Sequence, residues 1–340
     1  MKKILPRLAT MAVLALCQPS LQAQAPITKI AFGSCSRQDL PQPLWNDVVH
    51  DRPDVWVWLG DNIYGDTDDM GLLKAKYDIQ KKHPGYDSLR RLSKIFGIWD
   101  DHDYGKNDAG KEYAYRSQSR NLMYDFLDVP ANSPFRAQQG GYQAYTLGPD
   151  SQQVKIILLD GRYFRDSLAK NSNRQNVANT TGDVLGEAQW QWLENELRGS
   201  KAKVHLIGCG IQFLSEEHVY EKWGNFPAAK QRFLNLLTRT KPAGVVLLSG
   251  DRHIAEFSRT NVEGLLHPLY DVTSSGLTHV WTTPRFEPNR FREGPMIYAL
   301  NYGLIEIDWN ARPLRLTLLI KGNDHATLLR QVVDLTPPAQ

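Results

Sequence analysis

The sequence predicts a layered α/β fold, and three observations support this prediction. Six apolar runs, rich in β-branched or aromatic residues, each end in glycine or polar residues. These runs are continuous rather than alternating, which is typical of strands that are covered on both faces. Segments with helical spacing lie between them, and such alternation of strands and helices indicates layers of both kinds. The last third of the chain instead contains strands with short connections.

The elements can be assigned in order along the chain. We expect buried strands at residues 27–32, 54–59, 95–99, 154–159, 204–207 and 245–248. We expect helices at residues 41–50, 72–82, 86–92, 112–127, 187–198 and 228–237. Further strands at residues 270–273, 302–309 and 314–320 are predicted to form a second sheet that packs on the first and is antiparallel at its edge. Residues 281–294 are predicted to be a long loop, of the kind that forms rims or lids in enzymes.

Residues 1–23 have the pattern of a secretory signal peptide. Lys2, Lys3 and Arg7 accompany an apolar run that is too short for a bilayer, which requires about 20 residues. We favour cleavage after Ala23, with export to the periplasm or the medium. An uncleaved anchor and a lipoprotein signal at Cys17 are the alternatives, although the residue before Cys17 is larger than such a signal prefers.

The predicted mature chain is a single domain at residues 24–335, followed by a loose tail at residues 336–340. Loss of residues 1–23 removes three basic residues and no acidic one, so the formal net charge falls from +3 to 0. A neutral chain has no overall electrostatic attraction for nucleic acid or for an anionic membrane. We therefore expect a monomer with a small-molecule substrate, no specific nucleic-acid binding and no transmembrane span after cleavage.

Polar clusters directly follow the predicted strands. In open α/β sheets, ligands bind just beyond the carboxyl ends of the strands. Four clusters contain residue types that bind metals: Cys35; Asp61 and Tyr64; Asp100, Asp101 and His102; Asp251 and His253. Such side chains can converge from separate strands on one or two cations, and a two-metal site stabilises both the attacking and the leaving oxygen of phosphoryl transfer. The clusters therefore predict a metal-dependent hydrolase of phosphoric esters.

Each cluster also has a simpler interpretation when it is taken alone. Asp61 is a common type of turn or helix-capping residue, Tyr64 is a common core residue, and His253 is compatible with a hydrogen-bonded core histidine. Residues 100–103, Asp-Asp-His-Asp, are harder to explain in this way. Three carboxylates directly after an apolar strand repel one another unless a cation is present. The clusters taken together favour the metal site.

Five motifs together resemble those of a known family. They are FGSC at residues 32–35, LGDNIY at 59–64, WDDHD at 99–103, LDGRYFRD at 159–166 and LSGDRH at 248–253. In order and spacing they resemble the motifs of the PhoD-like (alkaline phosphatase D-type) metallophosphatases. The resemblance implies a calcineurin-like, four-layer αββα sandwich in which helices flank two mixed β-sheets. It also implies hydrolysis of phosphate monoesters or diesters with ferric iron and calcium, and other divalent metals are the alternative.

The resemblance further implies roles for the metal-binding residues. Asp61 would bridge both ions. The other iron ligands would be Cys35, Tyr64 and either Asp251 or His253, and the remaining carboxylates, Asp100 and Asp101 among them, would hold the second ion. A thiolate and a phenolate are strong anionic donors that suit trivalent iron, and carboxylates in place of neutral ligands favour calcium or magnesium at the second position.

The predicted reaction is the in-line attack of a metal-bound hydroxide on phosphorus. His102 would stabilise the transition state or protonate the leaving group. Arg162, Arg165, Arg252 and Asn107 are predicted to bind the substrate, because guanidinium groups pair bidentately with phosphate oxygens. Arg165 can alternatively pair with the aspartate that follows it, and Asn107 can be a turn residue.

Three other side chains need separate consideration. Ser34 is rejected as a nucleophile, because no general base is spaced for it and it should point away from Cys35 at a strand end. Cys35 and Cys209 would form a disulfide or remain buried thiols. Whether Cys209 or Gln212 reaches a metal is left undecided by the sequence.

Two other functions are the alternatives to a general phosphoesterase. The first is a phosphodiesterase or phospholipase D-like enzyme that acts on lipid or nucleotide diesters. Residues 281–294 would then form the leaving-group pocket together with Trp223 and Phe226. The second is a phosphate- or metal-binding protein without turnover, which ranks lower because no ligand position is visibly deleted.

Overall fold

The structure is a computed structural model that describes residues 24–283 and 287–335. The predicted signal peptide and the predicted tail therefore lie outside the described residues, as do residues 284–286 of the predicted loop. No helix of the described part combines the length and the apolar character that a membrane crossing requires.

Two large mixed β-sheets form the centre of the described part. The first sheet has the order β15 (Thr327–Leu335), β14 (Leu314–Lys321), β13 (Tyr302–Asp308), β1 (Lys29–Gly33), β2 (Val55–Leu59) and β3 (Lys94–Ile98). The second has the order β12 (Arg292–Ile297), β10 (Ala255–Thr260), β11 (Leu269–Ser274), β9 (Val245–Ser249), β8 (Val204–Cys209), β5 (Val154–Leu158) and β4 (Gln143–Leu147). A small separate hairpin consists of β6 (Ala169–Lys170) and β7 (Asn176–Val177).

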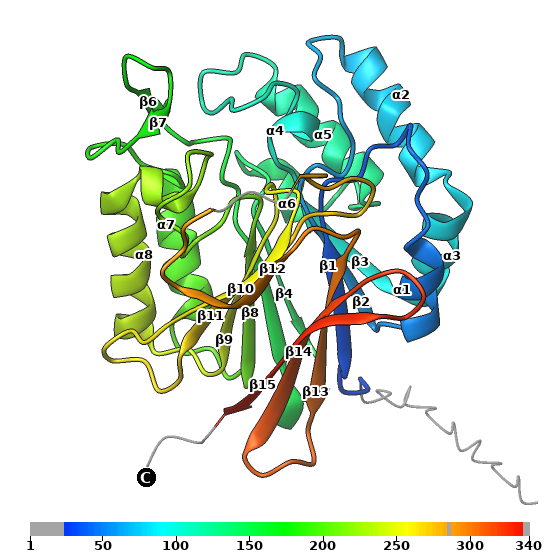
Figure 1. Cartoon of the computed structure of the whole chain (residues 1–340), viewed down its shortest axis with the longest axis vertical. Helices are drawn as coiled ribbons and strands as arrows, with labels where there is room; N and C mark the ends of the chain where they lie inside the picture. The colour runs from blue at the N-terminus through cyan, green and yellow to red at the C-terminus, as the bar shows by residue number, and fades with distance from the viewer. Residues whose placement is uncertain (1–23, 284–286, 336–340) are drawn as a thin grey trace, which may run out of the picture.

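Helices cover the outer face of each sheet. Figure 1 shows α1, α2, α3 and α5 beside the first sheet, and α7 and α8 beside the second. The bounds are α1 (Trp45–Asp51), α2 (Met70–Lys81), α3 (Pro84–Leu92), α4 (Asp101–Tyr104), α5 (Arg116–Phe126), α6 (Pro134–Ala137), α7 (Gly186–Leu197) and α8 (Pro227–Thr240). Two 3₁₀ turns lie at Asp150–Gln152 and Trp223–Asn225. The arrangement is the four-layer αββα sandwich, so the predicted fold class is confirmed.

The core explains why the strands are apolar without interruption. Successive side chains of a strand point to opposite faces of its sheet. Leu206 and Leu248 belong to the core between the sheets, whereas Ile207 and Leu247 belong to the core beneath α7 and α8. Because both faces of these strands are buried, polar residues are tolerated only where each strand ends.

The predicted nine strands and six helices are all present, with bounds that shift by a few residues. The assignment of the strands to sheets was wrong in one respect. We expected the last third of the chain to form the second sheet, but β13 and β14 join the first, where β1 pairs antiparallel with β13 through Ile30 and Ile305. The second sheet comes mainly from the middle of the chain, since alternation shows that a segment is a strand but does not identify its partner.

Strand direction brings the polar clusters to one end of the sandwich. β1, β2 and β3 are parallel to one another, and β5, β8 and β9 are parallel within the second sheet. The chain therefore leaves each of these strands at a carboxyl end that it shares with its neighbours. Figure 1 shows these ends at the top of the molecule, beside the β6–β7 hairpin.

Candidate active site

The loops that follow the strands are joined to one another through the backbone. Ser36 N donates to the carbonyl of Asp61 at 2.8 Å, which links the loop after β1 to the loop after β2. Gly250 N donates to the carbonyl of Gly210 at 2.8 Å, which links the loops after β8 and β9. The buried carboxylate of Asp103 accepts hydrogen bonds from Asp61 N at 3.2 Å and from Asp100 N at 2.7 Å. The loops thus hold the clusters in fixed positions.

Four of the predicted metal ligands have a left-handed backbone. The φ angles are 59° at Cys35, 48° at Asp61, 69° at Asp251 and 54° at His253. This region is uncommon for residues with a side chain, and it costs of order 1–3 kcal/mol at each position. Such strain persists where the surrounding structure requires it, and it clusters at active sites. The chain turns sharply after β1, β2 and β9, and each of these turns carries a predicted ligand.

The predicted metal ligands converge in three groups that share one residue. Within each group the ligand atoms all lie within 4.8 Å of one another. The groups are Cys35, Asp61 and His253; Asp61, Asp101 and His102; and Asp61, Asp100, Asp101 and Asp251. Asp61 belongs to all three groups. A carboxylate that bridges two cations must occupy such a shared position.

Tyr64 completes the first group. Its hydroxyl lies 3.4 Å from Oδ2 of Asp61 and 2.9 Å from Nε2 of His253. Cys35 Sγ lies 3.5 Å from the same Asp61 oxygen. A thiol, a phenol, a carboxylate and an imidazole therefore meet at one point, and this set of donors fits a transition metal such as iron.

The electrostatics of the carboxylates also fit bound cations. Burial raises the pKa of Asp61 to about 8, and it raises the pKa values of Asp100 and Asp251 well above the ordinary range. Oδ2 of Asp100 is buried without a hydrogen-bond partner. Gly210 makes room for this side chain, because a Cβ at that position would collide with the Asp100 carboxylate. A buried carboxylate group of this kind is costly without a cation and favourable with one.

His102 lies beside the shared aspartate with a fixed ring orientation. Its Nδ1 is 2.8 Å from Oδ1 of Asp66, and its ring stacks on Tyr64 with the ring centres 4.1 Å apart. Burial disfavours the charged imidazole, but the carboxylates of Asp61, Asp66 and Asp101 outweigh it and raise the pKa of His102 to about 10. Since Asp66 engages Nδ1, Nε2 is the ring nitrogen left for a substrate.

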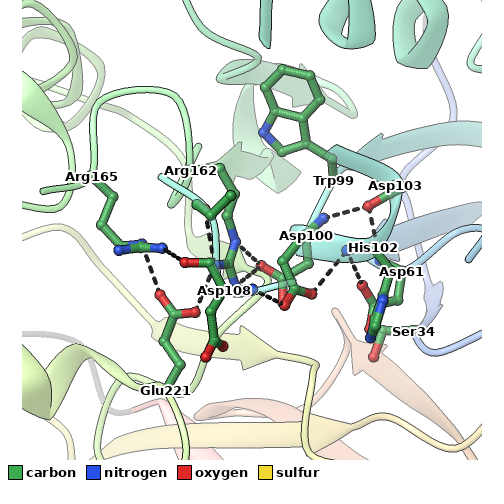
Figure 2. A network of polar contacts seen from close by, with 12 residues as sticks. Ser34, Asp61, Trp99, Asp100, His102, Asp103, Asp108, Arg162, Arg165 and Glu221 are labelled. Carbon is green, nitrogen blue, oxygen red and sulfur yellow. Dashed lines mark hydrogen bonds and ion pairs between the residues drawn. The ribbon is translucent and has the colours of Figure 1, made fainter. Parts of the chain in front are cut away.

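Arg162 and Arg165 are placed differently from the prediction. Both are fully buried, and Figure 2 shows that their guanidinium groups meet at Glu221. Arg162 NH1 lies 2.6 Å from Oε2 of Glu221, Arg165 Nε lies 2.8 Å from Oε1, and Arg162 Nε also donates to Asp100 at 2.6 Å. Neither arginine lines the cavity at the site, and carboxylates of the chain engage both guanidinium groups, so the predicted contact with the substrate stays a prediction. The predicted alternative partner of Arg165, the carboxylate of Asp166, instead pairs with Lys111.

A cavity of about 380 Å³ opens beside the three groups. Asp101, His102, Asp251 and His253 line it, and so do two of the predicted substrate-binding residues, Arg252 and Asn107. The guanidinium of Arg252 is 2.5 Å from Oε2 of Glu287 and lies 4.0 Å from the ring centre of Tyr220. Asn107 is exposed at the mouth. Trp281, at the start of the predicted rim loop, also lines this cavity.

Several predicted neighbours of the site are structural instead. Ser34 is buried and its hydroxyl donates to the carbonyl of Ser274 at 3.1 Å. Cys35 and Cys209 are both free, so the disulfide alternative is wrong. Gln212 donates to Glu256 and Thr273, and Cys209 belongs to no metal-binding group found among the described residues. Trp223 and Phe226 belong to the core beneath α8 rather than to a pocket.

Three residues that contact the site were not predicted. Asp66 orients His102, Glu221 holds the two arginines, and His279 packs its ring 4.3 Å from that of His253. Asp66 lies two residues after Tyr64, in a stretch dense with acidic residues, and its closeness to the LGDNIY motif was a usable signal. Glu221 and His279 lie in loops with no motif, and only the folded chain reveals them.

In this structure, ligand groups that share an aspartate lie at the strand ends of an αββα sandwich. This arrangement is typical of the two-metal phosphoesterases. Comparison with known proteins agrees with this class. The family model described as PhoD-like phosphatase matches residues 73–284, and the chain belongs to this family. The matched segment contains Asp100, Asp101, Asp251 and His253, while Cys35 and Asp61 precede it.

Similar proteins point in the same direction. Alkaline phosphatase D of Bacillus subtilis is 24% identical over 288 residues, which cover 72% of this chain. The chain spans about half the length of this curated relative, 49%. A solved structure of PhoD has a TM-score of 0.69 at 16% identity, and the match covers 94% of this chain and 74% of that chain.

The fold is also shared with proteins of other kinds. A dimetal phosphatase from Danio rerio has a TM-score of 0.59 at 12% identity, with 92% of this chain and 100% of that chain covered. GAP50, described as the anchor in the inner membrane complex of Plasmodium, has a TM-score of 0.60 at 11% identity, with 92% and 90% covered. At these identities the similarity concerns the fold alone, so activity has to be argued from the site.

Proposed function

We propose that this protein is a metal-dependent phosphoesterase that hydrolyses phosphate monoesters or diesters. The observation that carries the proposal is the position of Asp61, whose carboxylate belongs to three groups of metal-binding atoms at once. The family and the relative described as alkaline phosphatase D support the same reaction class. Ferric iron with calcium is the pair of ions that we propose, and the mixed donor set supports it.

The ligand groups suggest which residue holds which ion. His253 groups with Cys35 and Asp61, beside Tyr64, whereas Asp251 groups with Asp100 and Asp101. We therefore assign His253 rather than Asp251 to the iron position. The second position is made of carboxylates only, which is the ligand type that calcium or magnesium prefers.

Bound cations would supply a nucleophile at neutral pH and would neutralise charge on the phosphoryl oxygens. The protein itself orients the other participants. Asp66 fixes the His102 ring so that Nε2 can donate to the leaving oxygen or to the transferred group. The backbone N–H groups of His102 and Asp108 hold Asp101 in place, at 2.9 and 2.7 Å. Ser34 has no role in the reaction.

The experiment is a hydrolysis assay with p-nitrophenyl phosphate and bis-p-nitrophenyl phosphate, on protein whose metal content has been measured. The ratio of the two rates identifies a monoesterase or a diesterase. The Asp61→Asn variant should lower kcat by about a thousandfold, because it removes the bridging charge while it keeps the shape of the side chain. The matched control is Asp78→Asn on the exposed face of α2, which should keep full activity.

Two results would overturn parts of the proposal. Near-normal kcat in Asp61→Asn, with an unchanged circular dichroism spectrum, would rule out the bridging role. Metal-replete protein that binds inorganic phosphate but hydrolyses neither ester would favour a binding protein, and GAP50 is an example of this fold in a protein described as an anchor. Zinc as the sole bound metal would contradict the iron assignment but not the reaction class.

Export and the monomeric state remain predictions from the sequence. Sequencing the amino terminus of the secreted or periplasmic protein would test cleavage after Ala23. Light scattering of the purified protein would test the monomer.

A further inference from the structure

The cavity beside the metal-binding groups has a second wall that the proposed reaction does not use. One side is formed by Asp101, His102, Asp251 and His253. The β6–β7 hairpin supplies the facing residues: Lys170, Arg174, Gln175 and Asn176. The cavity is therefore lined by cations and amides on the hairpin side and by acidic residues on the metal-binding side, and Asp108 and Glu221 also line it.

The hairpin presents these residues on a fixed turn. Asn171 Oδ1 accepts hydrogen bonds from Asn173 N and Gln175 N, both at 3.0 Å, and Asn171 N donates to the carbonyl of Gln175 at 3.0 Å. No aspartate or glutamate occurs at residues 167–182. Lys170 and Arg174 thus lie on a preformed turn whose own sequence does not neutralise them.

These two cations are less neutralised by the protein than the other cations of the site. Lys170 Nζ is 3.6 Å from Oδ2 of Asp108, and both side chains are well exposed, so solvent weakens this pair. Arg174 makes no ion pair with any residue of the described part. By contrast, Glu287 neutralises Arg252 at 2.5 Å, and the arginines next to Glu221 are fully buried.

A phosphate held at the metal-binding groups would not need the hairpin. The ions and the side chains around Asp61 suffice for one phosphoryl group. A substrate with a single phosphate would therefore leave Lys170 and Arg174 facing solvent. A second phosphate at the other end of the cavity would meet an arginine, which binds phosphate oxygens bidentately, and a lysine, which supplies a mobile positive charge.

We infer that the preferred substrates are phosphate esters whose leaving group carries a second phosphate, which Lys170 and Arg174 bind. The inference rests on the proposed function, because it takes the reacting phosphate to lie at the metal-binding groups. It narrows the substrate class from any phosphoric ester to compounds with two phosphates that are separated by a short polar linker. The amides of Gln175 and Asn176 would contact such a linker.

The test compares glucose 1,6-bisphosphate with glucose 1-phosphate, by phosphate release from metal-loaded protein. The variant is Lys170→Gln combined with Arg174→Gln. We expect the ratio of kcat/KM for the bisphosphate to kcat/KM for the monophosphate to fall by about tenfold or more. The fall should come mainly from a higher KM for the bisphosphate, since each lost charge-assisted hydrogen bond weakens the binding of this compound only. The fall should shrink at high salt, because the hairpin cations are exposed.

The matched control removes the same charge at the other end of the sheet. Lys201→Gln combined with Lys203→Gln changes two lysines immediately before β8, far along the strand from its carboxyl end, and should leave the ratio unchanged. An equal fall in the control would show that net charge, and not the hairpin, sets the preference, and would overturn the inference.

The remaining outcomes separate the two proposals. If the wild-type protein hydrolyses p-nitrophenyl phosphate and the hairpin variant keeps the same ratio, the inference is wrong and the proposed function stands. If no ester is hydrolysed, the proposed function fails. Calorimetric titration of metal-loaded protein with glucose 1,6-bisphosphate then tests separately whether the hairpin binds the second phosphate. An equal affinity in the wild type and the hairpin variant would overturn this binding role.

Discussion

Two buried charged clusters lie side by side in this protein and differ in how their charge is balanced. In the first, Arg162 and Arg165 share Glu221, and Arg162 also binds Asp100, so that each guanidinium has a carboxylate partner. In the second, Asp61, Asp101 and Asp251 join Asp100, which pairs with Arg162. Figure 2 shows Asp100 between the two clusters.

The difference separates a structural element from a ligand site. Buried charges persist when they are paired, and the arginine cluster is paired in charge by residues of the chain itself, although Arg162 Nη2, Arg165 Nε and Glu221 Oε1 lack a hydrogen-bond partner. The carboxylate cluster is less balanced within the chain, since burial raises the pKa values of Asp61, Asp100 and Asp251, whereas in Asp101 burial is outweighed by Arg162 and His102, which lower its pKa. The first cluster should therefore contribute to stability in any condition, and the second only when cations are bound.

The largest effect is expected when the balanced cluster is broken. Glu221→Gln removes the carboxylate between two buried guanidinium groups and should lower the free energy of unfolding by about 3–5 kcal/mol. Urea unfolding followed by circular dichroism measures this change. The control is Glu194→Gln on α7, whose ion pairs with Arg198 and Arg239 are solvent-exposed, and it should cost less than about 1 kcal/mol.

A loss in Glu221→Gln that matches the control would remove the distinction between the clusters. It would show that water or a neighbouring group replaces the carboxylate between the arginines. The arginines would then be available to a ligand after all, and their predicted role in substrate binding would return.

An intermediate effect is expected from pH in the metal-free protein. Burial raises the pKa of Asp61 to about 8, whereas an aspartate in an unfolded chain titrates near about 3.9. The folded state therefore binds more protons than the unfolded state between these values. The free energy of unfolding should fall as the pH rises through this window, and the raised pKa of His102, about 10, should extend the fall above pH 8.

Urea titrations at several pH values, with and without a chelator, measure this dependence. Cations favour the ionised carboxylates, so the metal-loaded protein should be more stable and should lose less stability as the pH rises. Asp61→Asn should flatten the dependence in the metal-free protein. Metal-free protein that gains stability between about pH 4 and 8 would contradict the assignment of an unbalanced cluster.

The smallest effect is expected at Ser34, which directly precedes the predicted ligand Cys35. Its buried hydroxyl donates to the Ser274 carbonyl at 3.1 Å and to Cys35 Sγ at 3.7 Å. Ser34→Ala should change kcat by less than about twofold and should cost about 1 kcal/mol of stability, the usual value of one hydrogen bond. A loss of activity as large as that in Asp61→Asn would restore the serine as a nucleophile.

The strand ends show how far the sequence could be interpreted without a structure. Asp61, Asp101 and Asp251 each follow an apolar run by two or three residues, and the parallel direction of such strands places their ends together. The gathering of these carboxylates was therefore predictable from the strand ends, whereas the shared position of Asp61 was predicted from the family resemblance. The roles of Arg162 and Arg165 were not predictable, because an arginine in a motif looks the same whether it faces a cavity or a buried glutamate.

The sequence by itself determined the strands, the helices between them and the residues that gather at the strand ends. These features depend on local patterns of apolar and polar residues and on short motifs. The tertiary structure decided which strands share a sheet, which arginines are buried and which hairpin faces the cavity. The pairing of Glu221 with two arginines, and the placement of Lys170 and Arg174 opposite the metal-binding groups, join segments far apart in the chain. No local pattern encodes such contacts, because they arise only when separate loops meet at one end of the folded sandwich.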